Sequence, residues 1–256
     1  MRNNHIIGLL IIVIAVLLLN KNRENFENQT ENRIAMSYVI NLESDKDRFK
    51  ILKKQLRHAN LPYTRFEAIL GKNVTKNDPL YKFYFSEQGK DKLKPAQIGC
   101  SLSHIYLWNK ISKEPKDNLY LILEDDAVVP VDFHHRLNTY LEQLPKDWEM
   151  LLLGCNMTIG SYYSPNWIHK KKKIRKNGNY GLYGYVLRPQ TAQKLLKLCE
   201  AMDTTIDHYL DKNYYLNNPV YIATPVIIEH NFSFYSNILE KKRTDDERRA
   251  NSVRIV

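Results

Sequence analysis

Three consecutive carboxylates, Glu124, Asp125 and Asp126, follow a short apolar run in the stretch LYLILEDDAVVP. Adjacent carboxylates repel one another, so such a cluster needs cations or hydrogen-bond donors around it. The apolar run predicts a buried strand, and ligands of open α/β sheets lie beyond the carboxyl ends of such strands. Alternation along the strand would send Glu124 and Asp126 to one side and Asp125 to the other.

Two carboxylates on one side of a sheet offer the hard oxygen ligands that Mn²⁺ or Mg²⁺ prefers. Such a cation would bind the diphosphate of a nucleotide and stabilise negative charge as the phosphate leaves. The competing interpretation is an acidic turn whose side chains cap the next segment or face water. The triplet alone leaves both interpretations open.

Short apolar runs and helical patterns alternate along the chain from residue 34 onward. The runs predict strands over 36–42, 63–70, 119–123 and 148–155. Ser44 and Asp45 offer N-cap chemistry for a helix that reaches Ala59, and helical spacing predicts further helices over 95–111, 133–144 and 189–202. The segment 73–94 predicts a loop with one short helix. This order predicts an α/β fold over residues 34–256, with helices flanking a mixed, mostly parallel sheet.

The N-terminal residues 6–19, IIGLLIIVIAVLLL, carry no polar side chain. Fourteen helical residues span about 21 Å, short of a hydrocarbon core of about 30 Å, but no small-residue cleavage site follows. We therefore expect an uncleaved signal-anchor helix over residues 1–20, a stem over 21–33 and a single-pass membrane protein. Four glycosylation sequons would permit a lumenal catalytic domain, and they begin at Asn28, Asn73, Asn156 and Asn231.

The overall composition is that of a folded protein with an excess of basic residues. Of the 256 residues, 43% are hydrophobic and 26% charged, which excludes a chain that is disordered throughout. The net charge of +10 favours anionic partners such as phosphates, nucleotides or an acidic membrane surface. The cysteines Cys100, Cys155 and Cys199 lack metal-ligand spacing, so we expect buried thiols, with a single disulfide possible.

The run HKKKKIRK at residues 169–176 is the densest basic segment. Alone it is typical of a nuclear-localisation or nucleic-acid-binding patch. The apolar N-terminus and the lack of regularly spaced aromatic residues argue against a nucleic-acid partner. A solvated loop is the plain interpretation, and a loop that attracts an anionic acceptor or lipid headgroups is the alternative.

Four stretches, SYVINLESDKDRF, LKPAQIGCSLSHIYLW, LYLILEDDAVVP and NYGLYGYVLRPQTAQKLL, occur in this order. Together they resemble glycosyltransferase family 25, which includes bacterial lipooligosaccharide β-galactosyltransferases and collagen hydroxylysine galactosyltransferases. The resemblance covers about Tyr38 to Ile238, and IGCSLSHIYLW followed by the acidic triplet is its most specific part.

This resemblance implies a GT-A fold, a UDP-sugar donor, Mn²⁺ or Mg²⁺ as cofactor, and inversion at the anomeric carbon. It favours galactose from UDP-galactose, moved to a hydroxyl of a glycan, a lipid-linked sugar or hydroxylysine. UDP-glucose is the alternative donor. A membrane-tethered binding module that uses the basic run without catalysis is the alternative function.

The resemblance also assigns roles at matching positions. It implies that Asp126 binds the metal, with Glu124 and His230 as further ligands, and that Asp207 is the general base for the acceptor hydroxyl. The nucleotide-sugar-binding residues that it implies are Asn41, Arg48, Gly71, Ser103, His104, Glu124, Asp125, Gly184 and Tyr185.

Each of these roles has a structural alternative. Arg48 could lie on a helix surface, His104 could be a core histidine, and Asp207 could cap a helix. Two positions depart from the family pattern, because Leu70 and Gln97 stand where acidic residues are frequent. A contact that needs a negative charge there is lost or altered.

Overall fold

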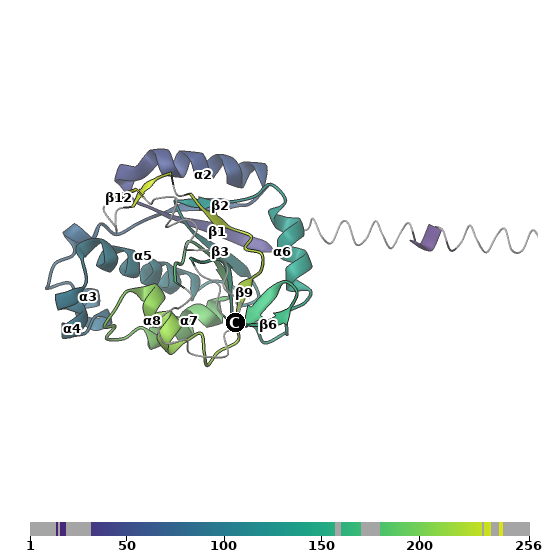
Figure 1. Cartoon of the computed structure of the whole chain (residues 1–256). Coiled ribbons are helices and arrows are strands. Elements are labelled where there is room, and N and C mark those ends of the chain that lie inside the picture. Colours follow the sequence, from purple (N-terminus) through teal and green to yellow (C-terminus); the bar gives the residue numbers. More distant parts are fainter. Residues whose placement is uncertain are drawn as a thin grey trace, which may run out of the picture.

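The computed structural model describes residues 14, 16–18, 32–156, 160–169, 180–231, 233–236 and 241–242. The anchor and stem that we predict over residues 1–33 lie almost entirely outside this part, as does most of the basic run at 169–176. Within the described residues, no helix is both long and apolar enough to cross a membrane. They form an α/β structure in which helices cover a large sheet (Figure 1).

The large sheet has the strand order β2-β1-β3-β8-β5-β9-β7-β6. Six of these eight strands point the same way, because β8 and β7 are each antiparallel to both neighbours while β1–β2, β1–β3 and β5–β9 pair in parallel. The prediction of a mixed, mostly parallel sheet is therefore confirmed. The strands are β1 (Ile34–Asn41), β2 (Tyr63–Glu67), β3 (Leu119–Glu124), β5 (Met150–Gly154), β6 (Ser161–Ser164), β7 (Trp167–His169), β8 (Gly184–Leu187) and β9 (Val220–Ala223).

Helices lie on both faces of this sheet (Figure 1). They are α2 (Lys46–His58), α3 (Pro79–Tyr84), α4 (Glu87–Lys92), α5 (Pro95–Ile111), α6 (Phe133–Leu141), α7 (Pro189–Leu198) and α8 (Ile206–Asn213), with the short 3₁₀ turns η1 (Glu43–Asp45) and η2 (Gly71–Asn73). Two small antiparallel pairs join β4 (Ala127–Val128) to β10 (Glu229–His230) and β11 (Tyr235–Ser236) to β12 (Lys241–Lys242).

The alternation of side chains along β3 divides the interior into two hydrophobic clusters. Leu121 and Leu123 pack in the cluster that contains the buried residues of α2 and α6, whereas Tyr120 and Ile122 pack with those of α5, α7 and α8. Every residue from Leu119 to Leu123 is buried, as a strand covered on both faces requires. This central strand therefore fixes the position of the acidic triplet at its end.

Several boundaries differ from those predicted. The segment 73–94 contains two helices, because Asp78 accepts hydrogen bonds from the first amides of α3 and Ser86 accepts one from Gly89 in α4. The predicted strand over 63–70 ends at Glu67, the helix over 133–144 ends at Leu141, and the helix over 189–202 ends at Leu198. Asp45 is the N-cap residue of α2, but its side chain makes no capping hydrogen bond.

Candidate active site

A cavity of about 750 Å³ lies at the carboxyl ends of β1 and β3. Its walls come from the start of α2, the segment between β2 and η2, the first turns of α5 and the acidic triplet. The residues that line it are Ile40, Leu42, Ser44, Asp45, Arg48, Ala68, Ile69, Leu70, Gly71, Lys72, Lys94, Pro95, Ala96, Cys100, Ser103, His104, Glu124, Asp125 and Asp126. This is the position at which an open α/β sheet binds ligands.

Arg48 lies between two of the three acids. Its Nη2 atom is 2.5 Å from Oδ1 of Asp125 and 3.1 Å from Oδ2 of Asp126. The alternation that we predict for Asp126 is therefore wrong, because β3 ends at Glu124 and the chain turns at the two aspartates. Asp125 and Asp126 share one guanidinium, which relieves their mutual repulsion.

Asp125 is the most deeply buried member of the triplet. Burial raises the pKa of its carboxyl to about 7, although Arg48 and a hydrogen bond from Asn41 oppose the rise. Asn41, the last residue of β1, donates from Nδ2 to Oδ2 of Asp125 at 2.7 Å. Its own Oδ1 accepts from Nε of Arg65 at 2.9 Å, which fixes the orientation of the amide. Asn41 and Arg48 thus hold the triplet in place, and Arg48 also lines the cavity.

His230 lies in contact with Asp126, the residue with which it is predicted to share a metal ion. The β4–β10 pair places His230 opposite Ala127, and its Nε2 lies 3.0 Å from Oδ2 of Asp126. Glu124, the third predicted metal ligand, instead faces α5 and approaches Nε2 of His104 at 3.4 Å. Two of the three predicted ligands are therefore in contact, whereas Glu124 lies beside His104 in the cavity wall.

His104 belongs to a buried hydrogen-bonded chain. Nε1 of Trp108 donates to the hydroxyl of Tyr185 at 2.9 Å, and this hydroxyl lies 2.9 Å from Nδ1 of His104. Because the hydroxyl accepts from Trp108, its proton can point to Nδ1, which leaves a proton on Nε2 for Glu124. His104 is fully buried and thus serves as a structural residue that also lines the cavity.

Ser103 and Gly71 build the wall beside His104. Ser103 donates to the carbonyl of Gly99 at 2.6 Å and accepts from the amide of Ile69 at 2.8 Å. A Cβ atom at Gly71 would lie 1.6 Å from the carbonyl oxygen of Pro95, so only glycine fits there. Both residues line the cavity, and their contacts hold the segment after β2 against α5.

Five of the predicted site residues do not line the cavity, namely Asn41, Gly184, Tyr185, Asp207 and His230. Gly184 and Tyr185 lie in β8, where Tyr185 is fully buried and reaches the cavity only through His104. Asp207, in the first turn of α8, accepts hydrogen bonds from the amides of Gly181 and His208 and from the hydroxyl of Thr205. The structural role that we weighed against catalysis for Asp207 is thus present.

The cavity also contains residues that the sequence analysis did not assign to it. Lys72 and Lys94 bring positive charge, and the position of Lys94 directly before the first residue of α5 was the available signal. Cys100 is half-buried in the cavity wall, while Cys155 and Cys199 are buried cysteines that form no disulfide. Burial and the charges of four nearby carboxylates raise the pKa of the Cys100 thiol well above its usual range.

A comparison with protein families identifies the family of this chain. The family described as glycosyltransferase family 25 (LPS biosynthesis protein) matches residues 35–210, so the chain belongs to that family. The matched region contains the acidic triplet, α5 and Asp207, but it ends before His230.

Individual relatives carry transferase names. A putative glycosyltransferase of Acanthamoeba polyphaga mimivirus is 29% identical over 166 residues, covering 60% of this chain and 50% of the relative. A putative glycosyltransferase of Haemophilus influenzae is 23% identical over 241 residues, covering 87% and 82%. Procollagen galactosyltransferase 1-B of Xenopus laevis is 28% identical over 172 residues, covering 62% of this chain and 27% of the relative. The chain thus spans about half of the mimivirus protein and about a quarter of the frog protein.

Proposed function

We propose that this protein is an inverting, metal-dependent hexosyltransferase that moves galactose from UDP-galactose to a hydroxyl group. Family membership supports glycosyl transfer, and the relatives named galactosyltransferases support the choice of sugar. UDP as the carrier, inversion and the GT-A classification rest on the resemblance of the four motifs. The acceptor class is a glycan, a lipid-linked sugar or hydroxylysine.

The observation that carries this proposal is the convergence of charge at one cavity. Acids of the triplet and the cations Arg48, Lys72 and Lys94 all line the same cavity of about 750 Å³. A nucleoside diphosphate sugar needs this combination, because its phosphates bind cations while its ribose and sugar hydroxyls donate to carboxylates. In our proposal, Glu124 and Asp125 accept from donor hydroxyls, and the two lysines contact the diphosphate.

Asp126 and His230 would hold the Mn²⁺ or Mg²⁺ ion. The contact between a carboxylate oxygen and an imidazole nitrogen at 3.0 Å brings two suitable ligands together from distant parts of the chain. A bound cation would supply charge stabilisation to the departing diphosphate. Arg48 contacts Asp126 at 3.1 Å and so orients this carboxylate.

Asp207 is the proposed general base that removes the proton from the acceptor hydroxyl. Its carboxylate is oriented by the amides of Gly181 and His208 and by Thr205. A general base must be held in a fixed orientation to reach the proton that it removes. Asp207→Asn should lower kcat while leaving the affinity for the donor unchanged. Asp203→Asn is the matched control, because Asp203 pairs with Lys212 on the surface. A collapse of donor affinity in Asp207→Asn would make this residue a binding residue.

A donor screen tests the proposal as a whole. The full chain is incubated with Mn²⁺ and either UDP-galactose or UDP-glucose, and released UDP is measured with and without candidate acceptors. We expect UDP-galactose to give the faster release, whereas faster release from UDP-glucose would support the alternative donor. No release above the blank from any donor would refute the transferase and favour the binding module.

The metal assignment has its own variant pair. Asp126→Ala should abolish UDP release because it removes a ligand next to His230, and the circular dichroism spectrum should remain that of a folded protein. Asp132→Ala is the control, since Asp132 is exposed and its side chain makes no capping hydrogen bond to α6. Near-normal activity of Asp126→Ala would disprove the assignment.

A further inference from the structure

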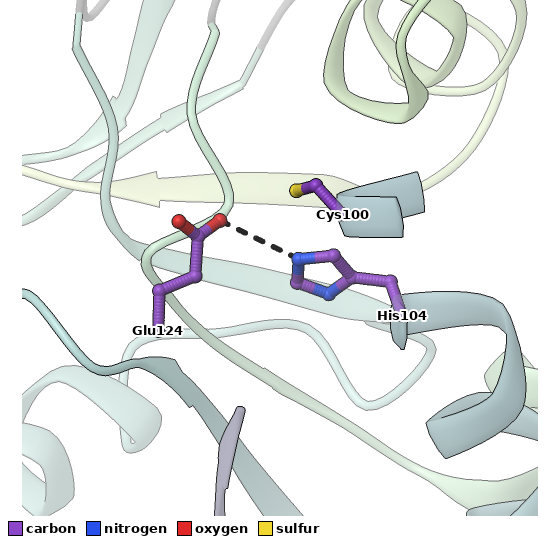
Figure 2. A group of neighbouring side chains, drawn as sticks. All are labelled: Cys100, His104 and Glu124. Atoms are coloured by element: carbon purple, nitrogen blue, oxygen red, sulfur yellow. Dashed lines mark hydrogen bonds and ion pairs between the residues drawn. The ribbon is translucent and has the colours of Figure 1, made fainter. Parts of the chain in front are cut away.

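A second group of potential metal ligands lies on the α5 side of the cavity. The ligand atoms of Cys100, His104 and Glu124 all lie within 4.8 Å of one another. Cys100 and His104 are one helical turn apart on α5, and Glu124 ends β3, so their side chains point toward one another (Figure 2). Neither Asp126 nor His230 is a member of this group.

We propose that Cys100, His104 and Glu124 form a binding site for Zn²⁺. Thiolate and imidazole ligands select Zn²⁺, whereas Mn²⁺ and Mg²⁺ prefer oxygen ligands. Three protein ligands leave a fourth tetrahedral position open for water or a ligand group. The donor set therefore differs in kind from the Asp126–His230 pair, although Asp126 lines the same cavity as Cys100, His104 and Glu124.

The ligand atoms of Cys100, His104 and Glu124 are near enough to enclose a Zn²⁺ ion after a small movement. Zinc binds sulfur at about 2.3 Å and nitrogen or oxygen at about 2.0–2.2 Å, so the ligand atoms must approach by roughly 1 Å. Glu124 can supply this movement because its side chain is 26% exposed. His104 is fully buried and already points Nε2 toward Glu124, with 3.4 Å between Nε2 and Oε1.

The surroundings of His104 suit a metal ligand. A histidine that binds a metal through one nitrogen usually makes a hydrogen bond with the other, which fixes the ring. Nδ1 of His104 faces the hydroxyl of Tyr185 at 2.9 Å. This hydroxyl can donate to Nδ1 or accept from it, so the ring keeps its place when Nε2 binds the ion.

The electrostatic field at Cys100 also favours a divalent cation. Burial, together with the negative charges of Glu124, Asp207, Asp126 and Asp125, raises the pKa of its thiol. The same negative field attracts Zn²⁺, and a bound ion deprotonates a coordinating thiol outright. These four carboxylates therefore favour the binding of the metal beside Cys100.

The binding of Zn²⁺ does not depend on the proposed transferase activity. Glu124 belongs to both arrangements, however, so an ion held by Cys100 and His104 would remove this carboxylate from the donor sugar nucleotide. This consequence, inhibition by Zn²⁺, rests on the proposed function. The direct test therefore measures metal binding alone.

Co²⁺ is the spectroscopic probe, because a thiolate ligand gives it a charge-transfer band in the near ultraviolet and four-coordinate geometry gives it intense visible bands. The full chain, reduced with a non-thiol reductant, is titrated with Co²⁺, and Zn²⁺ is then added to displace it. We expect both sets of bands at one equivalent of Co²⁺ and their loss on addition of Zn²⁺. Absence of a thiolate band in the unaltered protein would overturn the proposal.

Variants identify the ligands. Cys100→Ser should remove the charge-transfer band and weaken Zn²⁺ binding by roughly 100-fold or more, since even a group that only supports a ligand contributes about 10–100-fold. Cys199→Ala is the matched thiol control and should leave the band intact, because Cys199 is a buried cysteine that lines no part of the cavity.

Glu124→Gln provides a second ligand variant that keeps the side-chain shape, and circular dichroism checks the fold of each protein. The Glu124→Gln substitution should weaken Zn²⁺ binding while the thiolate band remains. If Cys100→Ser kept the band and His230→Ala removed it, the ion would be bound at the other site and the proposal would be wrong.

Discussion

Replacing Tyr185 with phenylalanine would test whether the buried chain from Trp108 to Glu124 is a structural unit. The substitution removes one hydroxyl and keeps the aromatic ring, so the hydrophobic packing of β8 against α5 is preserved. The lost hydroxyl is the partner of Nε1 of Trp108 at 2.9 Å and of Nδ1 of His104 at 2.9 Å. Trp108, His104 and Tyr185 are all fully buried, so water cannot replace it.

The size of the effect follows from the number of polar atoms that lose their partner. Each buried group left without a hydrogen bond costs about 1–3 kcal/mol, so two such groups reduce the free energy of unfolding by roughly 2–6 kcal/mol. In a domain of this size, 1 kcal/mol corresponds to about 2–4 °C in Tm. We therefore expect Tyr185→Phe to lower Tm by at least about 4 °C.

Thermal unfolding followed by circular dichroism measures this change. Tyr209→Phe is the control, because the hydroxyl of Tyr209 makes only a long, exposed contact of 3.5 Å with the carbonyl of Glu200. The control should stay within about 0.5 kcal/mol of the unaltered protein. If Tyr185→Phe unfolded at the same temperature as the control, the hydroxyl would not hold His104, and the buried chain would be no structural unit.

Two further substitutions test the proposed metal site and the wall of the cavity. His230→Ala should raise the Mn²⁺ concentration needed for half-maximal UDP release by about tenfold or more, because a direct ligand is lost; an unchanged titration curve would exclude His230 from the metal site. Gly71→Ala should destabilise the fold by about 1–3 kcal/mol, because its Cβ would lie 1.6 Å from the carbonyl oxygen of Pro95. Denaturant unfolding measures the second effect, with the exposed neighbour changed in Lys72→Ala as control, and equal stability of the two variants would contradict the packing argument.

Local sequence patterns were sufficient to predict the strand and the helix that carry the site. The apolar run before Glu124 predicted β3, and the helical spacing after Pro95 predicted α5 with its bounds of Pro95–Ile111. The motif that contains Ser103 and His104 placed both residues in the cavity wall. These predictions succeeded because burial on one strand or one helix face is encoded by residues close in sequence.

Contacts between elements could not be predicted in the same way. The ion pair of Arg48 with Asp125 depends on how α2 lies across the end of β3, which no local pattern encodes. The alternation rule failed at Asp126 because it holds only while the strand continues, and β3 ends two residues earlier. The reversed direction of β8 likewise follows from its antiparallel pairing with β3 and β5, two strands distant in sequence.

The contact between Gly71 and the start of α5 has a consequence for specificity. Here two peptide backbones meet without side chains between them, so the width of the cavity at this point is set by the main chain. A substitution at Gly71 cannot widen the cavity by shortening a side chain, because glycine has none, and any added side chain would clash with the carbonyl oxygen of Pro95. The neighbouring residues Leu70, Lys72 and Ala96 line the cavity on either side of the contact and carry side chains that a point mutation can shorten or lengthen. If the cavity binds the donor as we propose, these positions can change what it accepts without rebuilding the fold.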